Sequence, residues 1–292
     1  MTEIPQATTV HLHAAKSLLA LIVVGGLALD IRMLAALVRR RKDASHAPWL
    51  LPESGWSLPE ASQPLLAMLT AFVSTALAAG LARRMSLLPP DSLAHIALVL
   101  RTLLVPSVGL VVIARLLRRR NQSWRSAFGL PTQAAPFRSL VACGAAAYLA
   151  AMPLILSGMI AARALLRRFG HELAPQEALQ ILFDPQQPLW LQVYLVVIAV
   201  AGAPLFEETV FRGVLLPALA RPFGFPAAAA VTSLVFAALH SHAPSLLPLW
   251  ILGVGFSLGY ACSGSLLVPV TTHILFNGVN LMLQALSRPG GA

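Results

Sequence analysis

Long uninterrupted apolar runs constrain this sequence more than any other feature. Several are about 17 residues long or longer, which is enough to cross a hydrocarbon layer roughly 30 Å thick. Because lipid offers the backbone no hydrogen-bond partners, a segment that crosses it must be an α-helix or part of a closed barrel. The apolar residues here are continuous rather than alternating, which favours helices. We therefore predict an all-α fold, a polytopic membrane helix bundle of about eight transmembrane helices.

Composition supports this interpretation. Hydrophobic residues make up 57% of the 292 residues and charged residues only 11%, whereas a soluble domain usually carries about 25% charged residues. The predicted spans cover roughly residues 17–38, 64–82, 96–117, 139–162, 189–206 continuing to 219, 225–240, 245–262 and 266–286.

Basic residues stand in short clusters at the ends of the apolar runs. The formal net charge is +10, and the clusters lie at residues 39–42, 83–84, 118–120 and 167–168. Charges in such positions set membrane topology and bind lipid headgroups. We therefore expect the lipid bilayer, and not a nucleic acid, as the partner of this positive charge.

Three connections carry features of their own. Residues 39–63 are rich in proline, serine and tryptophan and are predicted to form an interfacial loop. Residues 121–137 are predicted to lie on the surface, with Trp124 and Phe128 at headgroup depth. Residues 170–188 are predicted to form a short amphipathic helix with a loop.

Acidic residues are rare inside the apolar runs, where only Asp30, Glu207 and Glu208 occur. A charged side chain in the middle of a bilayer costs about 2.5–3.5 kcal/mol even on the lenient insertion scale. Glu208 and Arg212 are four residues apart, so they can meet on one helix face. Glu207 points about 100° away from Glu208, which leaves it available for another partner. The alternative interpretation is a structural ion-pair cluster near the interface.

Two later spans place histidines in apolar surroundings. Phe236 and His240 share one helix face, and His273, Asn277 and Asn280 share another. A lone histidine on an apolar face is more often a hydrogen-bonded core residue than a catalyst. Because polar groups in a membrane bundle turn inward, we expect those of the three spans to converge on one cavity.

The span 245–262 contains a GxxxG pattern made by Gly255 and Gly259. Two glycines four residues apart on one face allow a neighbouring helix to approach closely. We expect this pattern to serve helix packing rather than ligand binding.

Three segments together resemble a known family. EETVFRG at 207–213, FAALH at 236–240 and HILFN at 273–277 resemble the EExxxR, FxxxH and HxxxN motifs of the CPBP intramembrane glutamic endopeptidases, the CAAX-protease, bacteriocin-processing and Abi-type family. The resemblance covers about 189–286 and implies a catalytic helix core there. Residues 1–188 match nothing beyond hydrophobic spans; we expect them to form membrane helices and interfacial loops, with a short tail over 287–292. EExxxR alone is a weak signal, but three motifs in order on three spans are specific.

The resemblance also implies a function and residue roles. The expected activity is metal-independent hydrolysis of peptide bonds within the membrane, with neither cofactor nor metal. Glu207 would be the base that activates water, helped by His240, and His273 with Asn277 would stabilise the oxyanion. Glu208 and Arg212 would orient the motif helix. The expected substrate is a membrane-anchored protein or a secreted peptide, and the expected location is the bacterial cytoplasmic membrane.

Two other functions remain open. Two histidines and a carboxylate could instead be the ligands of a zinc hydrolase, although the sequence contains no HExxH pattern. The fold could also act without catalysis, as a membrane scaffold, an immunity protein or a transporter component. Loss of activity on metal chelation would indicate the zinc hydrolase, and full biological activity of a Glu207→Gln variant would indicate the non-catalytic role.

Overall fold

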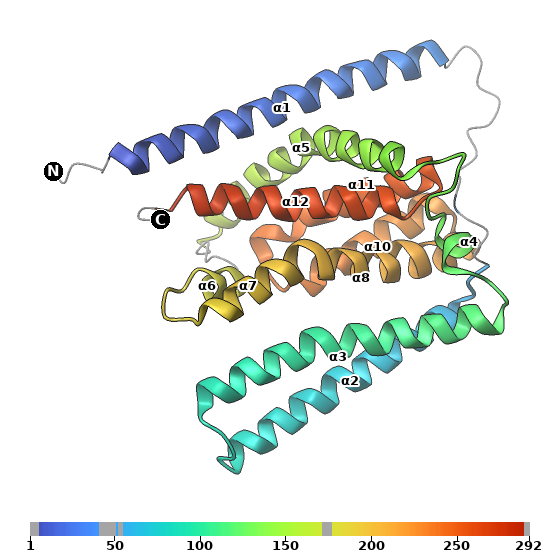
Figure 1. The fold of residues 1–292 in the computed structure, drawn as a ribbon. Coiled ribbons are helices and arrows are strands. Elements are labelled where there is room, and N and C mark those ends of the chain that lie inside the picture. The colour runs from blue at the N-terminus through green and yellow to red at the C-terminus, as the bar shows by residue number, and fades with distance from the viewer. Residues whose placement is uncertain (1–5, 41–50, 52–54, 171–176, 289–292) are drawn as a thin grey trace. The chain divides into compact units, whose positions relative to one another are not determined.

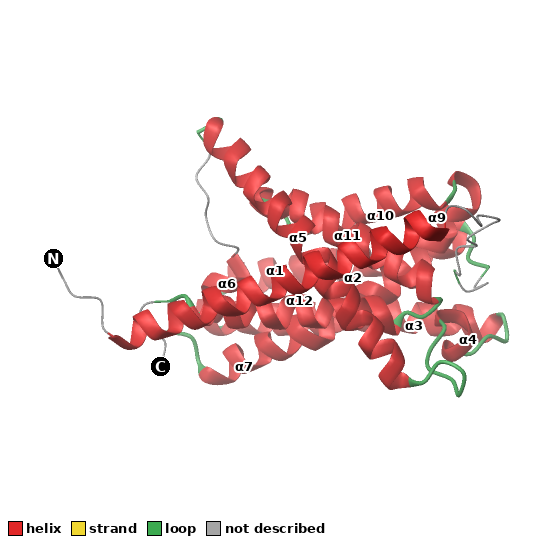
Figure 2. Ribbon diagram, turned by 90° about the horizontal axis from the view of Figure 1, so that it is seen from above, coloured by secondary structure: helices red, strands yellow, loops and turns green. Residues whose placement is uncertain are grey.

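The computed structural model describes residues 6–40, 51, 55–170 and 177–288, and every regular element in these ranges is a helix (Figures 1 and 2). This confirms the predicted all-α fold. Helices lie at all eight predicted spans: α1 (Gln6–Arg40), α2 (Leu58–Arg84), α3 (Pro90–Arg119), α5 (Phe137–Arg168), the continuous run α7 to α9 (Leu189–Phe223), α10 (Phe225–Leu239), α11 (Ala243–Ser263) and α12 (Leu267–Leu286).

Six of the described helices are long and apolar enough to cross a membrane. The other two of the eight are α10, with 15 residues, and α12, whose 20 residues include several polar side chains. Large apolar side chains cover the outside of the long helices, as at Leu77 and Ile160, which are 69% and 68% exposed. Contiguous apolar surface on this scale is what a lipid-facing helix presents.

The chain divides into two compact units, and each combines helices from both sides of residue 188. One unit contains residues 1–51, 131–174 and 229–292, and the other contains 52–130 and 175–228. The expected division at residue 188, between N-terminal helices and a catalytic core, stays a prediction.

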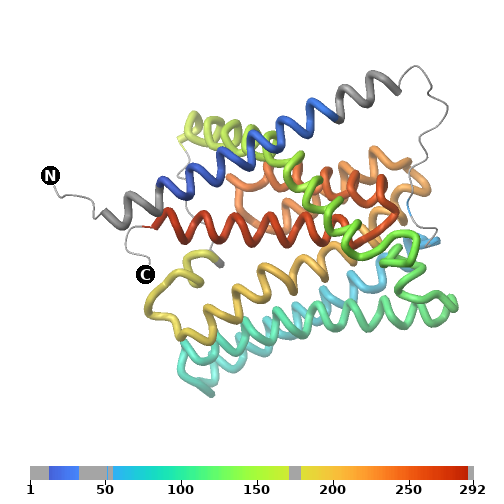
Figure 3. Tube along the Cα trace, turned by 45° about the horizontal axis from the view of Figure 1, so that its top comes forward, coloured from blue at the N-terminus to red at the C-terminus, as the bar shows by residue number. Residues whose placement is uncertain are grey.

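Helix α5 is the centre of the first unit and packs against α1, α11 and α12 (Figure 3). Close approach depends on glycine at Gly144, where a Cβ atom would lie 2.6 Å from Cβ of Thr271 and 2.8 Å from the carbonyl oxygen of Val268. Thr272 stabilises this contact between α5 and α12, because its hydroxyl donates to the carbonyl oxygens of Gly144 and Val268, each at 2.9 Å.

The GxxxG pattern is not the site of closest packing. A Cβ atom at Gly255 would meet Ala151 at 3.8 Å, which is ordinary contact, and one at Gly259 would meet Val268 at 3.4 Å. Both glycines face a neighbouring helix, as expected for a packing role, but at ordinary contact distances. Closer approaches occur at Gly26 on α1, Gly109 on α3, and Gly144 and Gly158 on α5, where an added Cβ atom would lie less than 3.0 Å from a neighbouring helix.

The second unit is built on the antiparallel hairpin of α2 and α3 (Figure 1). Helix α2 begins at Leu58, earlier than predicted, because Ser57 and Glu60 form a capping box. The backbone N–H of Ser57 donates to Oε2 of Glu60 at 3.1 Å, which satisfies a donor that the helix itself leaves open. Residues 41–50 and 52–54 of the predicted interfacial loop lie outside the described residues.

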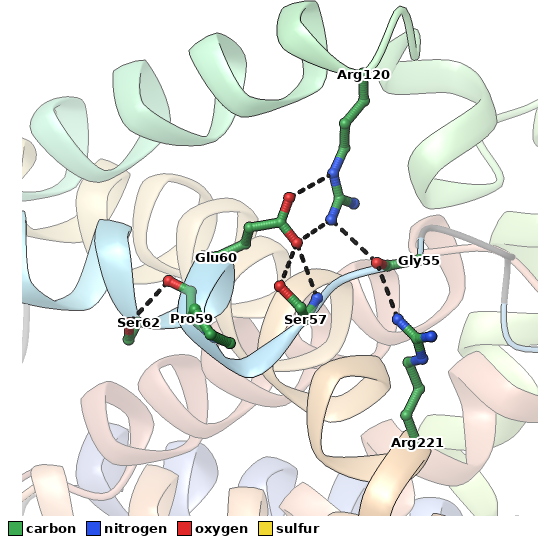
Figure 4. Close-up of polar contacts among 7 residues, drawn as sticks. All are labelled: Gly55, Ser57, Pro59, Glu60, Ser62, Arg120 and Arg221. Carbon is green, nitrogen blue, oxygen red and sulfur yellow. Dashed lines mark hydrogen bonds and ion pairs between the residues drawn. The ribbon is translucent and has the colours of Figure 1, made fainter.

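An ion pair joins the start of α2 to the end of α3, as Figure 4 shows. Arg120 donates to both carboxylate oxygens of Glu60 and, at 3.0 Å, to the carbonyl oxygen of Gly55. Its guanidinium carbon also lies 4.6 Å from the ring centre of Trp56, a fully buried side chain. Arg221, near the end of the α7 to α9 run, donates to the same carbonyl oxygen at 3.4 Å. Glu60 was predicted to lie in a loop, and the early start of α2 places it in a helix.

Two short helices complete the second unit. Helix α4 (Trp124–Phe128) is capped by Ser123 at its start and by Gly129, with φ 60°, at its end. Trp124 is 39% exposed, whereas Phe128 is 1% exposed and packs into the protein. The headgroup depth of both residues stays a prediction. Helix α6 (Glu177–Leu182) agrees with the short helix predicted within 170–188, of which residues 171–176 lie outside the described part.

Candidate active site

The first motif lies on a helix that changes its winding twice. The run consists of α7 (Leu189–Val197), the π-helix η1 (Ile198–Gly202), α8 (Ala203–Glu208), the π-helix η2 (Thr209–Leu215) and α9 (Leu216–Phe223). Each π segment is followed closely by a proline, Pro204 after η1 and Pro217 after η2. Proline has no N–H and its ring crowds the carbonyl four residues earlier, and the wider π turn relieves both problems.

Glu208 and Arg212 form a fully buried ion pair at the junction of α8 and η2. Nη1 of Arg212 donates to Oε1 of Glu208 at 3.0 Å, and neither side chain has exposed surface. Phe211 contributes a ring whose centre lies 5.8 Å from the guanidinium carbon of Arg212. Helices α2, α4 and α9 contact η2, so the pair lies inside the second unit. The predicted pairing of Glu208 with Arg212 is confirmed.

Glu207 differs from its neighbour in burial. Its side chain is half-buried, whereas that of Glu208 is completely enclosed. This agrees with the expectation that consecutive helix residues point in different directions, since each residue turns the helix by about 100°. Glu207 is therefore the more accessible of the two carboxylates.

His240 follows the last residue of α10, and a hydrogen bond fixes its ring. Nδ1 lies 2.8 Å from the carbonyl oxygen of Phe236. Because a carbonyl oxygen only accepts, Nδ1 must carry the proton and donate it, which makes Nε2 the accepting nitrogen of the neutral ring. The ring of His240 is exposed and lies 4.8 Å from that of Phe236, edge to face.

His273 is buried among aromatic rings from two other helices. It is 2% exposed, and its ring centre lies 5.7 Å from that of Phe236 on α10, at an interplanar angle of 82°. On α11, Phe256 stacks against His273 with ring centres 4.8 Å apart and an angle of 27°. His240 and His273 therefore both contact Phe236, so this unit gathers the second and third motifs around one ring.

Phe256 is the site residue that the sequence patterns missed. It lies on α11 with Leu252 and Tyr260, and the three are at most 1% exposed. Their spacing of four residues indicates one buried helix face. The GxxxG pattern of Gly255 and Gly259 instead predicts helix packing on the adjacent face. The row of large side chains at Leu252, Phe256 and Tyr260 is therefore the sequence signal that could have identified Phe256.

Asn277 lies one turn after His273 on α12, and its side chain is half-buried. Asn280, on the next turn, is exposed. His273, Asn277 and Asn280, which share one face of α12, therefore pass from buried to exposed along the helix. Asn277 is thus less exposed than Asn280, and its assignment as a site residue stays a prediction.

The six predicted site residues are divided between the two units. Glu207, Glu208 and Arg212 belong to one, and His240, His273 and Asn277 belong to the other. Their convergence on one cavity therefore stays a prediction. Within the described part of the chain, no group of three or more histidine, cysteine, aspartate or glutamate side chains is arranged to hold a metal ion.

Comparison with known proteins matches the segment that carries all three motifs. Residues 188–279 match the family of type II CAAX prenyl endopeptidase Rce1-like proteins. The membrane-embedded CAAX protease MroQ of Staphylococcus aureus (strain USA300) is 31% identical over 124 residues, which cover 40% of this chain and 48% of that protein. The putative membrane peptidase YdiL of Bacillus subtilis (strain 168) is 28% identical over 108 residues, which cover 37% and 43%.

The aligned region spans less than half the length of either relative. No solved structure matches the chain. The matched segment, the apolar helices and the bacterial relatives together confirm the family resemblance and an integral membrane protein of a bacterial cytoplasmic membrane.

Proposed function

We propose that this integral membrane protein, whose residues 188–279 are of the Rce1-like CAAX endopeptidase type, is a metal-independent glutamic endopeptidase that cleaves peptide bonds within the membrane. The observation that carries the proposal is the pair of histidines on one ring. His240 and His273 come from motifs far apart in the sequence, yet both contact Phe236. A fold that needed only apolar packing would not require two titratable rings there.

In the proposed mechanism, Glu207 removes a proton from a water molecule held by Nε2 of His240. The hydroxide attacks the carbonyl carbon of the substrate, and the resulting oxyanion accepts hydrogen bonds from His273 and Asn277. Collapse of the tetrahedral intermediate breaks the C–N bond, and Glu207 returns the proton to the leaving nitrogen. Each proton and electron pair is accounted for without a metal.

The buried pair has a supporting part in this proposal. Glu208 is fully buried and bonded to Arg212, which leaves it badly placed to meet water. The pair instead fixes the winding of the helix next to Glu207, and so the direction of that carboxylate. Adjacent glutamates can thus take different roles because their surroundings differ.

The proposed substrate is a protein or peptide presented from the bilayer, such as a membrane-anchored protein or a secreted peptide. The name of the Staphylococcus aureus relative, a membrane-embedded CAAX protease, supports a peptide-bond substrate. The fragments of a membrane-protein library cleaved by the purified enzyme would identify the class directly.

The decisive experiment compares wild type with Glu207→Gln on a fluorogenic peptide in detergent, with and without a chelator. Removing the general base should slow turnover by about 10²–10⁴-fold at unchanged melting temperature, and chelation should change nothing. Full turnover by Glu207→Gln would refute the proposed base. Loss of activity on chelation, restored by zinc, would instead establish a zinc hydrolase.

A further inference from the structure

We propose that the end of α3 and the turn into α4 form a binding surface for the headgroups of anionic phospholipids. This arginine surface consists of the exposed side chains Arg118, Arg119, Arg125 and Arg221 with the exposed ring of Trp124. It belongs to one compact unit and does not depend on the proposed hydrolysis.

The arginine surface lies at headgroup depth. Helix α3 has 30 residues and is therefore about 45 Å long at 1.5 Å per residue, while the hydrocarbon layer is only about 30 Å thick. About 15 Å of the helix therefore lies outside the hydrocarbon, and the adjacent charges of Arg118 and Arg119 favour placing the last turn of α3 there. Trp124, three residues past the capping turn, is the residue type that marks this depth in membrane proteins.

Two arginines from different helices share one hydrogen-bond acceptor beside the arginine surface. Arg120 at the end of α3 and Arg221 at the end of α9 both donate to the carbonyl oxygen of Gly55, which draws the two helix ends together (Figure 4). Helix α4, which carries Arg125, contacts α3 and is capped by Ser123, whose Oγ accepts from a backbone N–H at 3.1 Å. Arg120, the next residue after Arg118 and Arg119, is thus held beside Arg221, and Arg125 lies on a helix that contacts α3.

The positive charge of this group is not neutralised by the carboxylate beside it. Glu60 has both oxygens bound by Arg120. Among the described residues, no ion pair involves Arg118, Arg119, Arg125 or Arg221. Guanidinium groups bind phosphate oxygens in a bidentate manner, and at headgroup depth the available phosphates are those of lipids.

The other end of the hairpin offers a matched control. Arg83 and Arg84 are also an adjacent, exposed pair in the last turn of their helix, α2. The turn beyond them is followed by the exposed Asp91 in the first turn of α3. This pair therefore has the same local chemistry without the additional arginines and tryptophan of the arginine surface.

The test titrates the full chain in zwitterionic detergent with brominated phosphatidylglycerol or brominated phosphatidylcholine and follows the quenching of tryptophan fluorescence. Wild type should be quenched at lower mole fractions of phosphatidylglycerol, and Trp124→Phe should remove most of that difference. Since each arginine near an anionic surface contributes about fivefold to binding, Arg118→Gln with Arg119→Gln should weaken the preference at least tenfold. Arg83→Gln with Arg84→Gln should leave it within about twofold, because that pair lies at the other end of the α2–α3 hairpin from Trp124, whose quenching reports the bound lipid.

Several results would overturn the proposal. Equal loss from both double variants would mean a general surface potential, and an unchanged preference in Trp124→Phe would place the lipid elsewhere. Soluble glycerophosphate that competed as well as the lipid would make the surface a phosphate site unrelated to the membrane. Should the double variant fail to fold, Arg125→Gln, at an exposed position of α4, provides the measurement. A smaller loss of the preference is expected, and no loss would refute the surface.

Discussion

Replacing Glu208 with glutamine tests whether the buried ion pair supports the fold rather than performing the chemistry. The substitution keeps the size of the side chain and removes its charge. Arg212 would then be a cation without its carboxylate in a site where neither side chain has exposed surface. The adjacent Glu207 would be chemically unchanged.

The magnitude follows from the burial of the pair. Removing one partner of a buried ion pair costs roughly 3–5 kcal/mol, because the other charge stays behind without compensation. At about 2 °C per kcal/mol for a protein of this size, the melting temperature should fall by roughly 6–10 °C.

The same unit contains a control for this substitution. Glu60 and Arg120 form an ion pair whose side chains are 29% and 19% exposed, so solvent screens it. Glu60→Gln should cost about 1 kcal/mol or less, since water compensates the remaining charge and glutamine can still serve the capping box. The two substitutions are chemically identical and differ in burial.

The assay is a thermal melt of each variant in one detergent, beside turnover of a fluorogenic peptide per folded molecule. A double variant, Glu208→Leu with Arg212→Met, should regain much of the stability lost by Glu208→Gln, because no charge remains to be buried. Equal losses for Glu208→Gln and Glu60→Gln, or a double variant no better than the single one, would refute the argument. If Glu208→Gln were stable but inactive while Glu207→Gln melted early and stayed active, the two roles would be exchanged.

Three further outcomes are expected. Asn277→Ala should reduce kcat by about 10²–10³-fold with little change in melting temperature, as loss of one oxyanion donor does; unchanged turnover would remove Asn277 from the site. Phe256→Leu should lower kcat, because the ring of His273 loses its stacking partner. Phe256→Tyr keeps an aromatic ring and should retain much of the wild-type kcat. Equal activity of the two variants would show that stacking does not matter. Gly144→Ala should destabilise the fold by about 1–3 kcal/mol in thermal melts, because its Cβ would collide with Thr271; an unchanged melt would mean that the helices can separate freely.

The membrane helices could be predicted from the sequence because hydropathy is a local property that adds along the chain. All eight predicted segments are helical. The ends were less predictable where polar residues continue a helix. At Ser57 and Glu60 the apolar run has not yet begun, but the capping box already supplies the hydrogen bonds that a helix start needs.

The pairing of Glu208 with Arg212 was also predictable, since it depends only on spacing along one helix. Contacts between helices were not. Nothing in the sequence near Phe256 says that it will meet His273, and nothing near Gly144 says that Thr271 will face it. Such facts depend on which helices become neighbours, and hydropathy carries no information about that choice.

The two π segments of the motif helix change how its sequence should be read. A π turn accommodates an extra residue without a corresponding gain in length, so every side chain after it is shifted in phase by about 100° relative to an unbroken α-helix. A helical wheel drawn from Leu189 therefore loses its register at Ile198 and again at Thr209. When relatives are aligned, a gap of one residue near Pro204 or Pro217 can mark the gain or loss of such a turn, with the faces on either side of it unchanged.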